Sequence, residues 1–160
     1  MVDQLFRALT IVTAIGCGLI GGVFFAFSTF IMRALARLPA NEGIAAMQSI
    51  NIVVINPLFL SVFIGMAVAG VVLIISSLLK WHNSGSVYLI VGGALYVIGT
   101  FLVTMIFNVP RNNVLAALAP TSPEAARYWI EYVSSWTAWN HVRTVAALAA
   151  AASISMSLGD

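Results

Sequence analysis

The chain has 160 residues, of which 61% are hydrophobic and only 8% are charged, with a formal net charge of +2. A soluble domain of this size does not need so much apolar sequence, so the composition predicts an integral membrane protein. The small net charge and the lack of a basic cluster that could follow phosphates give no reason to expect nucleic-acid binding. The single cysteine, Cys17, excludes an internal disulfide.

Long apolar stretches predict four membrane helices in a single domain, residues 1–160. The expected spans are residues 5–35, 57–79, 86–109 and 137–158. Asn56 and Pro57 supply a cap and a first-turn proline for the second span, and Pro110 ends or kinks the third. Gly18 and Gly22 have the GxxxG spacing in the first span, which predicts close helix packing and permits a homo-oligomer.

Two shorter helices are expected on one side of the bundle, at residues 41–51 and 123–135. Asn41 is the predicted cap of the first, which lies in the membrane interface or folds against the bundle. Ser122 and Pro123 start the second, and its stripe of aromatic residues is typical of an interfacial anchor. The predicted fold class is therefore all-α, a four-helix transmembrane bundle with two short interfacial helices on one side.

Arg143 provides the strongest physical argument for a site. Only residues 144–159 are uncharged after it, and at about 1.5 Å per residue they span roughly 24 Å, less than the roughly 30 Å hydrocarbon core. The helix must therefore start earlier, which places Arg143 within or just under the membrane surface. An arginine there is a functional-site hypothesis, and an arginine that extends to a lipid phosphate is an equally good alternative.

Four crossings place the two longer connections on the same side, so polar residues from three helix boundaries converge there. The candidate catalytic residues are Arg143, Asn140, Asn112, Arg111 and Asn108. The candidate substrate-binding residues are Asn56, Trp136, Trp139, His141 and Phe27. Intramembrane polar residues normally face the bundle interior, which supports a shared site. The structural alternative is that the asparagine side chains hydrogen-bond carbonyl groups freed near Pro110.

Three motifs in chain order resemble the anthrone oxygenase-like family, also called the DUF1772 domain. They are Met47-Gln-Ser-Ile-Asn51 followed by Asn56-Pro57, then Asn108-Val-Pro-Arg-Asn112, and finally Trp136…Trp139-Asn140…Arg143. The resemblance covers nearly the whole chain. It implies an enzyme that oxidises an anthrone- or quinol-like aromatic molecule with O₂ and without a cofactor.

The chemistry that the resemblance implies suits these residue types. The protein would bind a flat apolar substrate and stabilise a developing oxyanion away from bulk water. Aromatic side chains suit the first task, and arginine and asparagine donors suit the second. His141 is the only nearby base with a suitable ordinary pKa, but it points about 100° away from Asn140 and can simply face the head groups.

No metal site is expected, because two histidines on opposite sides and one distant cysteine are fewer than the ligands of a typical zinc site. Haem ligation by His141 as a single axial ligand stays open. The alternative function is a non-catalytic membrane protein that binds a lipid or hydrophobic ligand, or a subunit of a larger membrane complex. In either case the expected partners are the bilayer and a hydrophobic aromatic molecule or lipid.

The expected location is a bacterial cell membrane. Arginine residues are more frequent on the site side of the predicted topology, so the positive-inside rule places the site towards the cytoplasm. This excess nearly vanishes when Arg111 and Arg143 are not counted because they belong to the site.

Overall fold

The computed structural model describes residues 2–79 and 85–159, and every regular element in these ranges is a helix. Five helices follow one another along the chain, and two of them contain π-helical segments. The first consists of α1 (Val2–Ala26), η1 (Phe27–Ile31) and α2 (Met32–Leu35). The next two are α3 (Ala40–Val53) and α4 (Pro57–Leu79). The last two are α5 (Ser86–Ala94) with η2 (Leu95–Leu102), η3 (Thr104–Asn108) and α6 (Val109–Ala116), and then α7 (Pro123–Met156).

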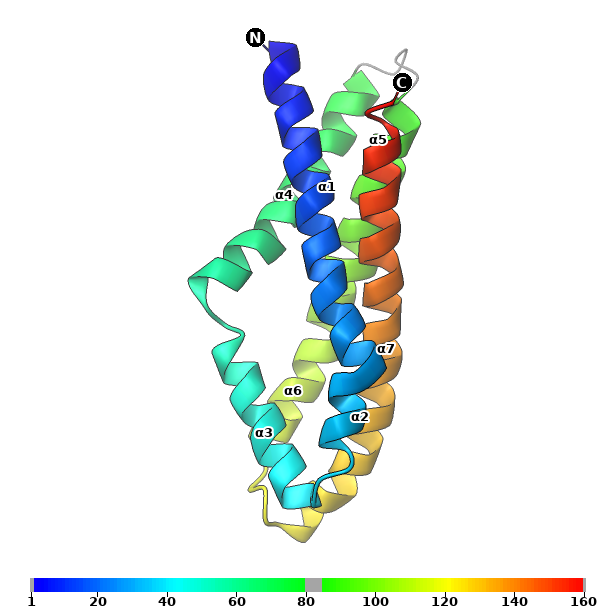
Figure 1. Cartoon of the computed structure of the whole chain (residues 1–160). Coiled ribbons are helices and arrows are strands. Elements are labelled where there is room, and N and C mark those ends of the chain that lie inside the picture. Colours follow the sequence, from blue (N-terminus) through cyan, green and yellow to red (C-terminus); the bar gives the residue numbers. More distant parts are fainter. Residues whose placement is uncertain (1, 80–84, 160) are drawn as a thin grey trace.

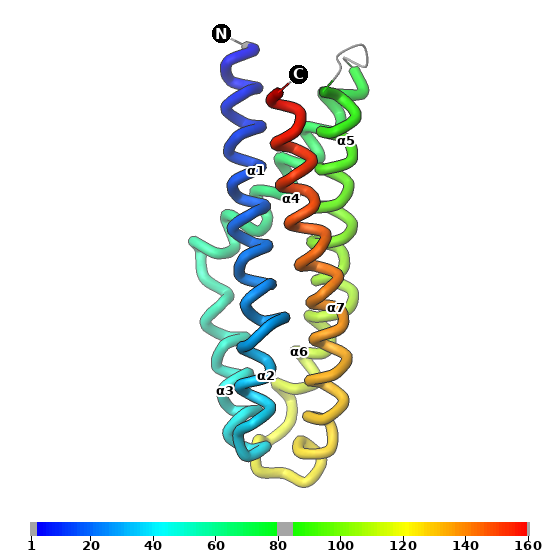
Figure 2. Tube along the Cα trace, turned by 45° about the vertical axis from the view of Figure 1, so that its right-hand side comes forward, coloured from blue at the N-terminus to red at the C-terminus, as the bar shows by residue number. Residues whose placement is uncertain are grey.

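The helices form a long bundle with both termini at one end (Figures 1 and 2). The first helix, the α5–α6 helix and α7 run side by side along its length, whereas α3 and α4 follow each other along one flank. The turns before α3 and before α7 lie at the end away from the termini. The predicted grouping of the termini on one side and the longer connections on the other is therefore confirmed.

The prediction of four apolar spans was wrong. Three helices in the described ranges are long and apolar enough to cross a membrane: Asp3–Leu35, Pro57–Leu79 and Ser86–Ala116. They fit a membrane protein. The predicted fourth span belongs to α7, which is not among them. Its second half relies on alanine and contains Arg143, and a helix packed among its neighbours needs less apolar sequence than one that faces lipid.

The predicted break between an interfacial helix at residues 123–135 and a membrane helix at 137–158 was also wrong. The 34 residues of α7 form one helix, since no glycine or proline interrupts them after Pro123. The aromatic stripe packs inward against the bundle instead of lying along the membrane surface. Ser122 does cap this helix as predicted, because its hydroxyl accepts from the backbone N–H of Ala125 at 3.1 Å.

Pro110 does not end the third long helix, which continues to Ala116. A π-helical segment, η3, ends at Asn108, two residues before the proline. The Arg111 Nη1 atom donates to the carbonyl oxygen of Phe107 at 2.7 Å, so an arginine side chain supplies a donor beside the proline. Asn108 in η3 and both Arg111 and Asn112 in α6 bond to α7, so these three side chains lie on the same side of the helix.

Two buried clusters fill the bundle. The membrane core lies among α1, α4, α5, η2 and the second half of α7. It consists of Ala14, Cys17, Ile20, Phe24, Phe63, Ala67, Leu73, Leu89, Tyr96, Ala147, Ala150 and Ile154. The aromatic core lies among α2, α3, α6 and the first half of α7. It consists of Met32, Leu35, Ile44, Met47, Leu115, Ala125, Trp129, Tyr132 and Trp136.

The length of α7 places the two cores relative to a bilayer. At 1.5 Å per residue its 34 residues span about 51 Å, well beyond the roughly 30 Å hydrocarbon core. The end that projects is the one with Glu124, Arg127 and Glu131, because charged side chains avoid lipid. The aromatic core therefore lies at the level of the head groups or beyond, and the membrane core lies within the bilayer.

Candidate functional site

Arg143 is buried where the two cores meet, with only 3% of its surface exposed. Its Nη2 donates to Oδ1 of Asn140 at 2.6 Å, and its Nη1 donates to Oγ1 of Thr104 at 3.3 Å. The guanidinium carbon also lies 4.2 Å from the centre of the Phe24 ring and 4.9 Å from that of the Trp136 ring. These contacts stabilise a cation by an amide oxygen and by cation–π attraction, and none of them is a carboxylate.

Asn140 ties α7 to the first helix. It is fully buried, and its Nδ2 donates to the carbonyl oxygen of Phe24 and to the hydroxyl of Ser28, both at 2.7 Å. Ser28 also lies 3.0 Å from the hydroxyl of Thr144. Since Oδ1 of Asn140 accepts from Arg143, one amide orients the guanidinium and fixes the helix that carries it.

Two buried polar atoms of this cluster have no hydrogen-bond partner: Nε of Arg143 and Oδ1 of Asn108. The other amide atom of Asn108, Nδ2, donates to the carbonyl oxygen of Trp136 at 3.2 Å. Buried polar atoms in folded proteins are normally hydrogen-bonded, so these two atoms mark the cluster as a candidate site. An N–H donor and an amide acceptor are thus available for further hydrogen bonds at this point in the bundle.

Asn112 lies one helical turn further along, where it serves as an acceptor. Its Oδ1 accepts from the hydroxyl of Tyr132 and from Nε1 of Trp136, both at 2.8 Å. The rings of Tyr132 and Trp136 lie 6.2 Å apart between their centres. Asn112 therefore holds the Trp136 ring beneath the Arg143 guanidinium, so it acts on the cluster through Trp136.

Arg111 and Trp139 flank this cluster. Arg111 Nε donates to the hydroxyl of Ser135 at 3.0 Å, which joins α6 to α7. Trp139 stacks on Phe107 with ring centres 3.6 Å apart and planes inclined by 6°. Tyr128 donates to the carbonyl oxygen of Arg111 at 3.4 Å. Partial burial raises the pKa of Tyr128, the charge of Glu131 raises it further, and that of Arg111 lowers it, so the phenol stays protonated.

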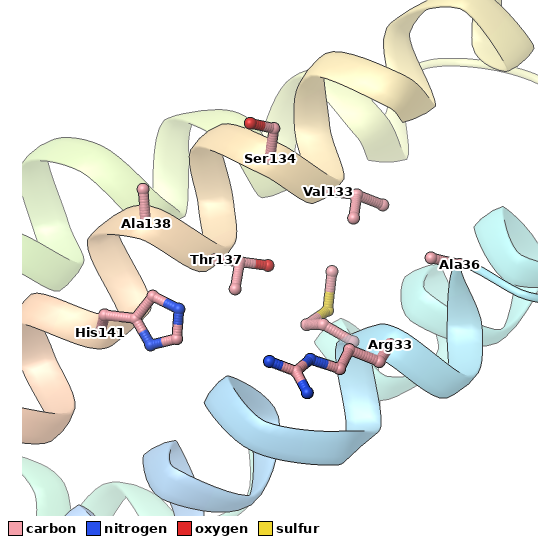
Figure 3. Close-up of a pocket in the computed structure, with 8 residues that line it drawn as sticks. Arg33, Ala36, Val133, Ser134, Thr137, Ala138 and His141 are labelled. Carbon is pink, nitrogen blue, oxygen red and sulfur yellow. The ribbon is translucent and has the colours of Figure 1, made fainter.

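The other three predicted substrate-binding residues, Phe27, Asn56 and His141, do not all lie in the Arg143 cluster. The Phe27 ring lies 5.6 Å from that of Trp136, so Phe27 belongs to the cluster. Asn56 caps α4 by accepting from the backbone N–H of Phe59 at 3.0 Å. His141 is exposed and lines a pocket of about 390 Å³ between α2 and α7 (Figure 3). Of the ten predicted site residues, only His141 lines this pocket.

Sequence reasoning missed several members of the cluster. They are Phe24, Ser28, Thr104, Tyr132 and Thr144. Serine and threonine occur inside membrane helices for local reasons, since their hydroxyls bond to carbonyls one turn earlier, as that of Thr104 does to Thr100 at 2.7 Å. Their residue type therefore gave no signal of a site. The i, i+4 spacing of Ser28 and Phe24 became informative only beside Asn140.

Metal binding finds no support in the part of the chain that the structure describes, where no group of three or more His, Cys, Asp or Glu side chains lies close enough to hold an ion. This agrees with the donor set of the cluster. Guanidinium, amide and hydroxyl groups favour an oxyanion over a cation.

Comparison with known proteins gives one family. A family model described as anthrone oxygenase matches residues 58–153, which is more than half of the chain. No curated protein and no solved structure matches significantly. The matched region extends from α4 to the second half of α7 and includes Asn108, Asn112, Asn140 and Arg143. The chain therefore belongs to the anthrone oxygenase family.

Proposed function

We propose that this protein is a membrane oxygenase that oxidises an anthrone- or quinol-like aromatic molecule with O₂ and without a cofactor. Family membership supports an oxygenase in general terms. Support for the substrate class comes from the buried cation of the cluster and the aromatic rings around it. The cytoplasmic orientation of the site and the bacterial origin of the membrane belong to the same proposal.

The observation that carries the proposal is the state of Arg143. A buried guanidinium without a carboxylate is costly inside a membrane protein. Nη1 and Nη2 each make one hydrogen bond, so two of the five N–H groups have a partner, and Nε has none. A site that holds an uncompensated cation among aromatic rings is complementary to a delocalised aromatic oxyanion, such as an enolate or phenolate.

The reaction requires little from the protein beyond this charge. An anthrone loses a proton from its CH₂ group to a base, and the resulting enolate oxygen interacts with the guanidinium. The enolate gives one electron to O₂, and the carbon radical combines with the superoxide formed. Loss of water from the hydroperoxide leaves a carbonyl group, so CH₂ and O₂ become C=O and H₂O. The side chains that contact Arg143 are neutral amide, hydroxyl and aromatic groups, so the base that accepts this proton is not one of them.

The test is O₂ uptake by the purified protein in liposomes that contain an anthrone. We expect Arg143→Met to lower kcat/KM about 10²–10³-fold, as loss of an oxyanion-stabilising donor does. Methionine fills similar volume without a charge, so the fold should persist, and far-UV circular dichroism checks this. Arg37→Gln is the matched control, since Arg37 is exposed and outside the cluster. Equal rates for wild type and Arg143→Met would refute the proposal.

One observation favours a non-catalytic alternative, in which the cluster only fastens helices together. Asn140 links α7 to both the carbonyl of Phe24 and the hydroxyl of Ser28. In that case the protein would bind a lipid or serve as a subunit of a larger complex. Two measurements separate the functions. A purely structural role of the cluster predicts no O₂ uptake by the wild type and a large loss of stability for Asn140→Ala.

A further inference from the structure

A pocket of about 390 Å³ lies on the outer flank of the bundle, between α2 and α7 (Figure 3). We name it the flank pocket. Its lining residues are Met32, Arg33, Ala36, Val133, Ser134, Thr137, Ala138 and His141. The lining combines apolar side chains with two hydroxyls, one guanidinium and one imidazole. An amphiphilic ligand matches this combination better than a wholly polar or wholly apolar one.

The two ionisable side chains that line the flank pocket, Arg33 and His141, are both basic. The side chains of Arg33 and His141 extend towards each other from α2 and α7 (Figure 3). Both residues are exposed, and the lining includes no aspartate or glutamate. The guanidinium and imidazole N–H groups are therefore free to donate to the oxygens of an anion.

A third polar group in the pocket has no partner in the structure. Thr137 Oγ1 is closed off from solvent and makes no hydrogen bond. Its oxygen is turned towards the space between α2 and α7 (Figure 3). Other helical threonines here bond to the carbonyl four residues earlier, as Thr10 and Thr144 do at 2.9 and 2.8 Å. Thr137 does not make this bond, although it lies in the middle of α7 at the wall of the flank pocket.

The height of the flank pocket along the bundle identifies the source of the anion. Arg33 follows Arg7 by 26 residues on one long helix, which is about 39 Å at 1.5 Å per residue. The hydrocarbon core is about 30 Å thick and the head groups bring it to about 40–45 Å. Arg7 and Arg33 therefore lie at the two head-group layers, and the flank pocket lies at the level of lipid phosphates.

We propose that the flank pocket binds an acidic membrane phospholipid. Arg33 and His141 donate to the phosphate oxygens, and Thr137 belongs to the pocket wall beside them. Met32, Ala36, Val133 and Ala138 form the apolar walls along which the glycerol and the first part of an acyl chain lie. This site is separate from the Arg143 cluster and does not depend on the proposed oxygenase activity.

The test is native mass spectrometry of the full chain in a neutral detergent with added phosphatidylglycerol or phosphatidylcholine. We expect phosphatidylglycerol to remain bound at lower concentration. Arg33→Gln should weaken its binding about tenfold, as loss of a charge-assisted hydrogen bond does. His141→Gln should weaken it about threefold. Thr137→Val should change it little, because this hydroxyl is closed off from solvent. Arg37→Gln is the matched control, because it removes the same charge four residues after Arg33. Arg37 is exposed and lies outside the pocket.

Three results would overturn the proposal. Equal weakening by Arg33→Gln and Arg37→Gln would show general attraction to surface charge. Equal affinity for both lipids would show no recognition of an acidic head group. Displacement of the lipid by inorganic phosphate at the same concentration would show a site for a free anion. Since Arg33, Thr137 and His141 lie on the outer surface or pocket wall, melting temperatures should stay close to wild type and keep these outcomes interpretable.

Discussion

The two cores of this bundle differ in the balance between small residues and large rings. In the membrane core, helices approach through glycine and alanine. A Cβ atom added to Gly93 would lie 2.7 Å from the carbonyl oxygen of Gly70, and one added to Gly99 would lie 2.6 Å from Cβ of Ala146. In the aromatic core, Trp129 stacks on Tyr132 with ring centres 5.5 Å apart. Small residues let the helices approach closely in the membrane core, which also holds the rings of Phe24, Phe63 and Tyr96. Indole and phenol rings fill the aromatic core.

The difference follows from the surroundings of each core. Lipid offers no hydrophobic gain for bringing two apolar helices together, so close backbone approach and van der Waals contact must stabilise the membrane core. The aromatic core borders water, where burial of large rings gives a substantial gain and their polar atoms still find partners. Gln48 adds polar links there, donating to the carbonyls of Leu115 and Leu118 at 2.8 and 2.9 Å near the end of α6.

The largest expected effect tests whether the stability of the aromatic core depends on its large rings. Trp129→Ala should lower the free energy of unfolding by about 3–5 kcal/mol, because Trp129 is 5% exposed and its removal leaves a cavity beside Tyr132 and Gly43. Chemical unfolding in detergent, followed by circular dichroism, measures this. Ile130→Ala is the control at a neighbouring position that is 76% exposed, where little change is expected.

Hydrogen exchange in the Trp129→Ala variant would show whether the cores are independent. We expect amides of α3 and α6 to lose protection while those of α4 and α5 keep it. Uniform loss of protection along the whole bundle would mean that both cores unfold as one unit. The two cores would then not be independent.

A smaller effect is expected from adding one methyl group to the membrane core. Gly93→Ala should lower the unfolding free energy by about 2–3 kcal/mol, because the new Cβ meets a backbone oxygen that cannot move aside as a side chain would. Gly22→Ala is the control, since no atom lies within 4 Å of the added Cβ there. A Gly93→Ala variant as stable as wild type would show that close approach of α4 and α5 is not what stabilises this core.

The smallest effect concerns the contact between the cores. Asn112→Ala removes the shared acceptor of Tyr132 and Trp136, and should lower the unfolding free energy by about 1–2 kcal/mol. The tryptophan fluorescence maximum should also shift as the indole N–H loses its partner. Asn113→Ala changes the adjacent exposed asparagine and should do neither. If both variants behave alike, Asn112 does not position the Trp136 ring.

Local signals in the sequence predicted much of this arrangement. Ser122 and Pro123 gave the start of α7, and the short uncharged stretch after Arg143 indicated a buried arginine. The predicted cap Asn41 was displaced, because α3 begins at Ala40 after Pro39. Gly18 and Gly22 make no unusually close approach within the chain, and the homo-oligomer that their spacing permits stays a prediction. Nothing lies within 4 Å of a Cβ on Gly22, and only Ala151, at 3.9 Å, lies near one on Gly18.

The glycine and hydroxyl contacts were missed for the same physical reason. Whether a glycine meets another helix, or a hydroxyl joins a polar cluster, depends on which side chain a distant part of the chain places opposite it. Ser28 lies 112 residues before Asn140, and local periodicity cannot relate them. The continuous α7 was missed for a different reason, since a change from polar to apolar composition was interpreted as a break although no helix-breaking residue was present.

The π-helical segments described in the α5–α6 helix have a consequence for how Arg143 is held. Each i→i+5 turn inserts residues into the α-helical repeat and so shifts the phase of every side chain that follows. Thr104 and Asn108 lie in η3, directly after η2, and both face α7. Deleting one residue from η2 would turn them by about 100° and leave their identities unchanged. The contacts of Arg143 thus depend on the count of residues before Thr104 as much as on the threonine itself.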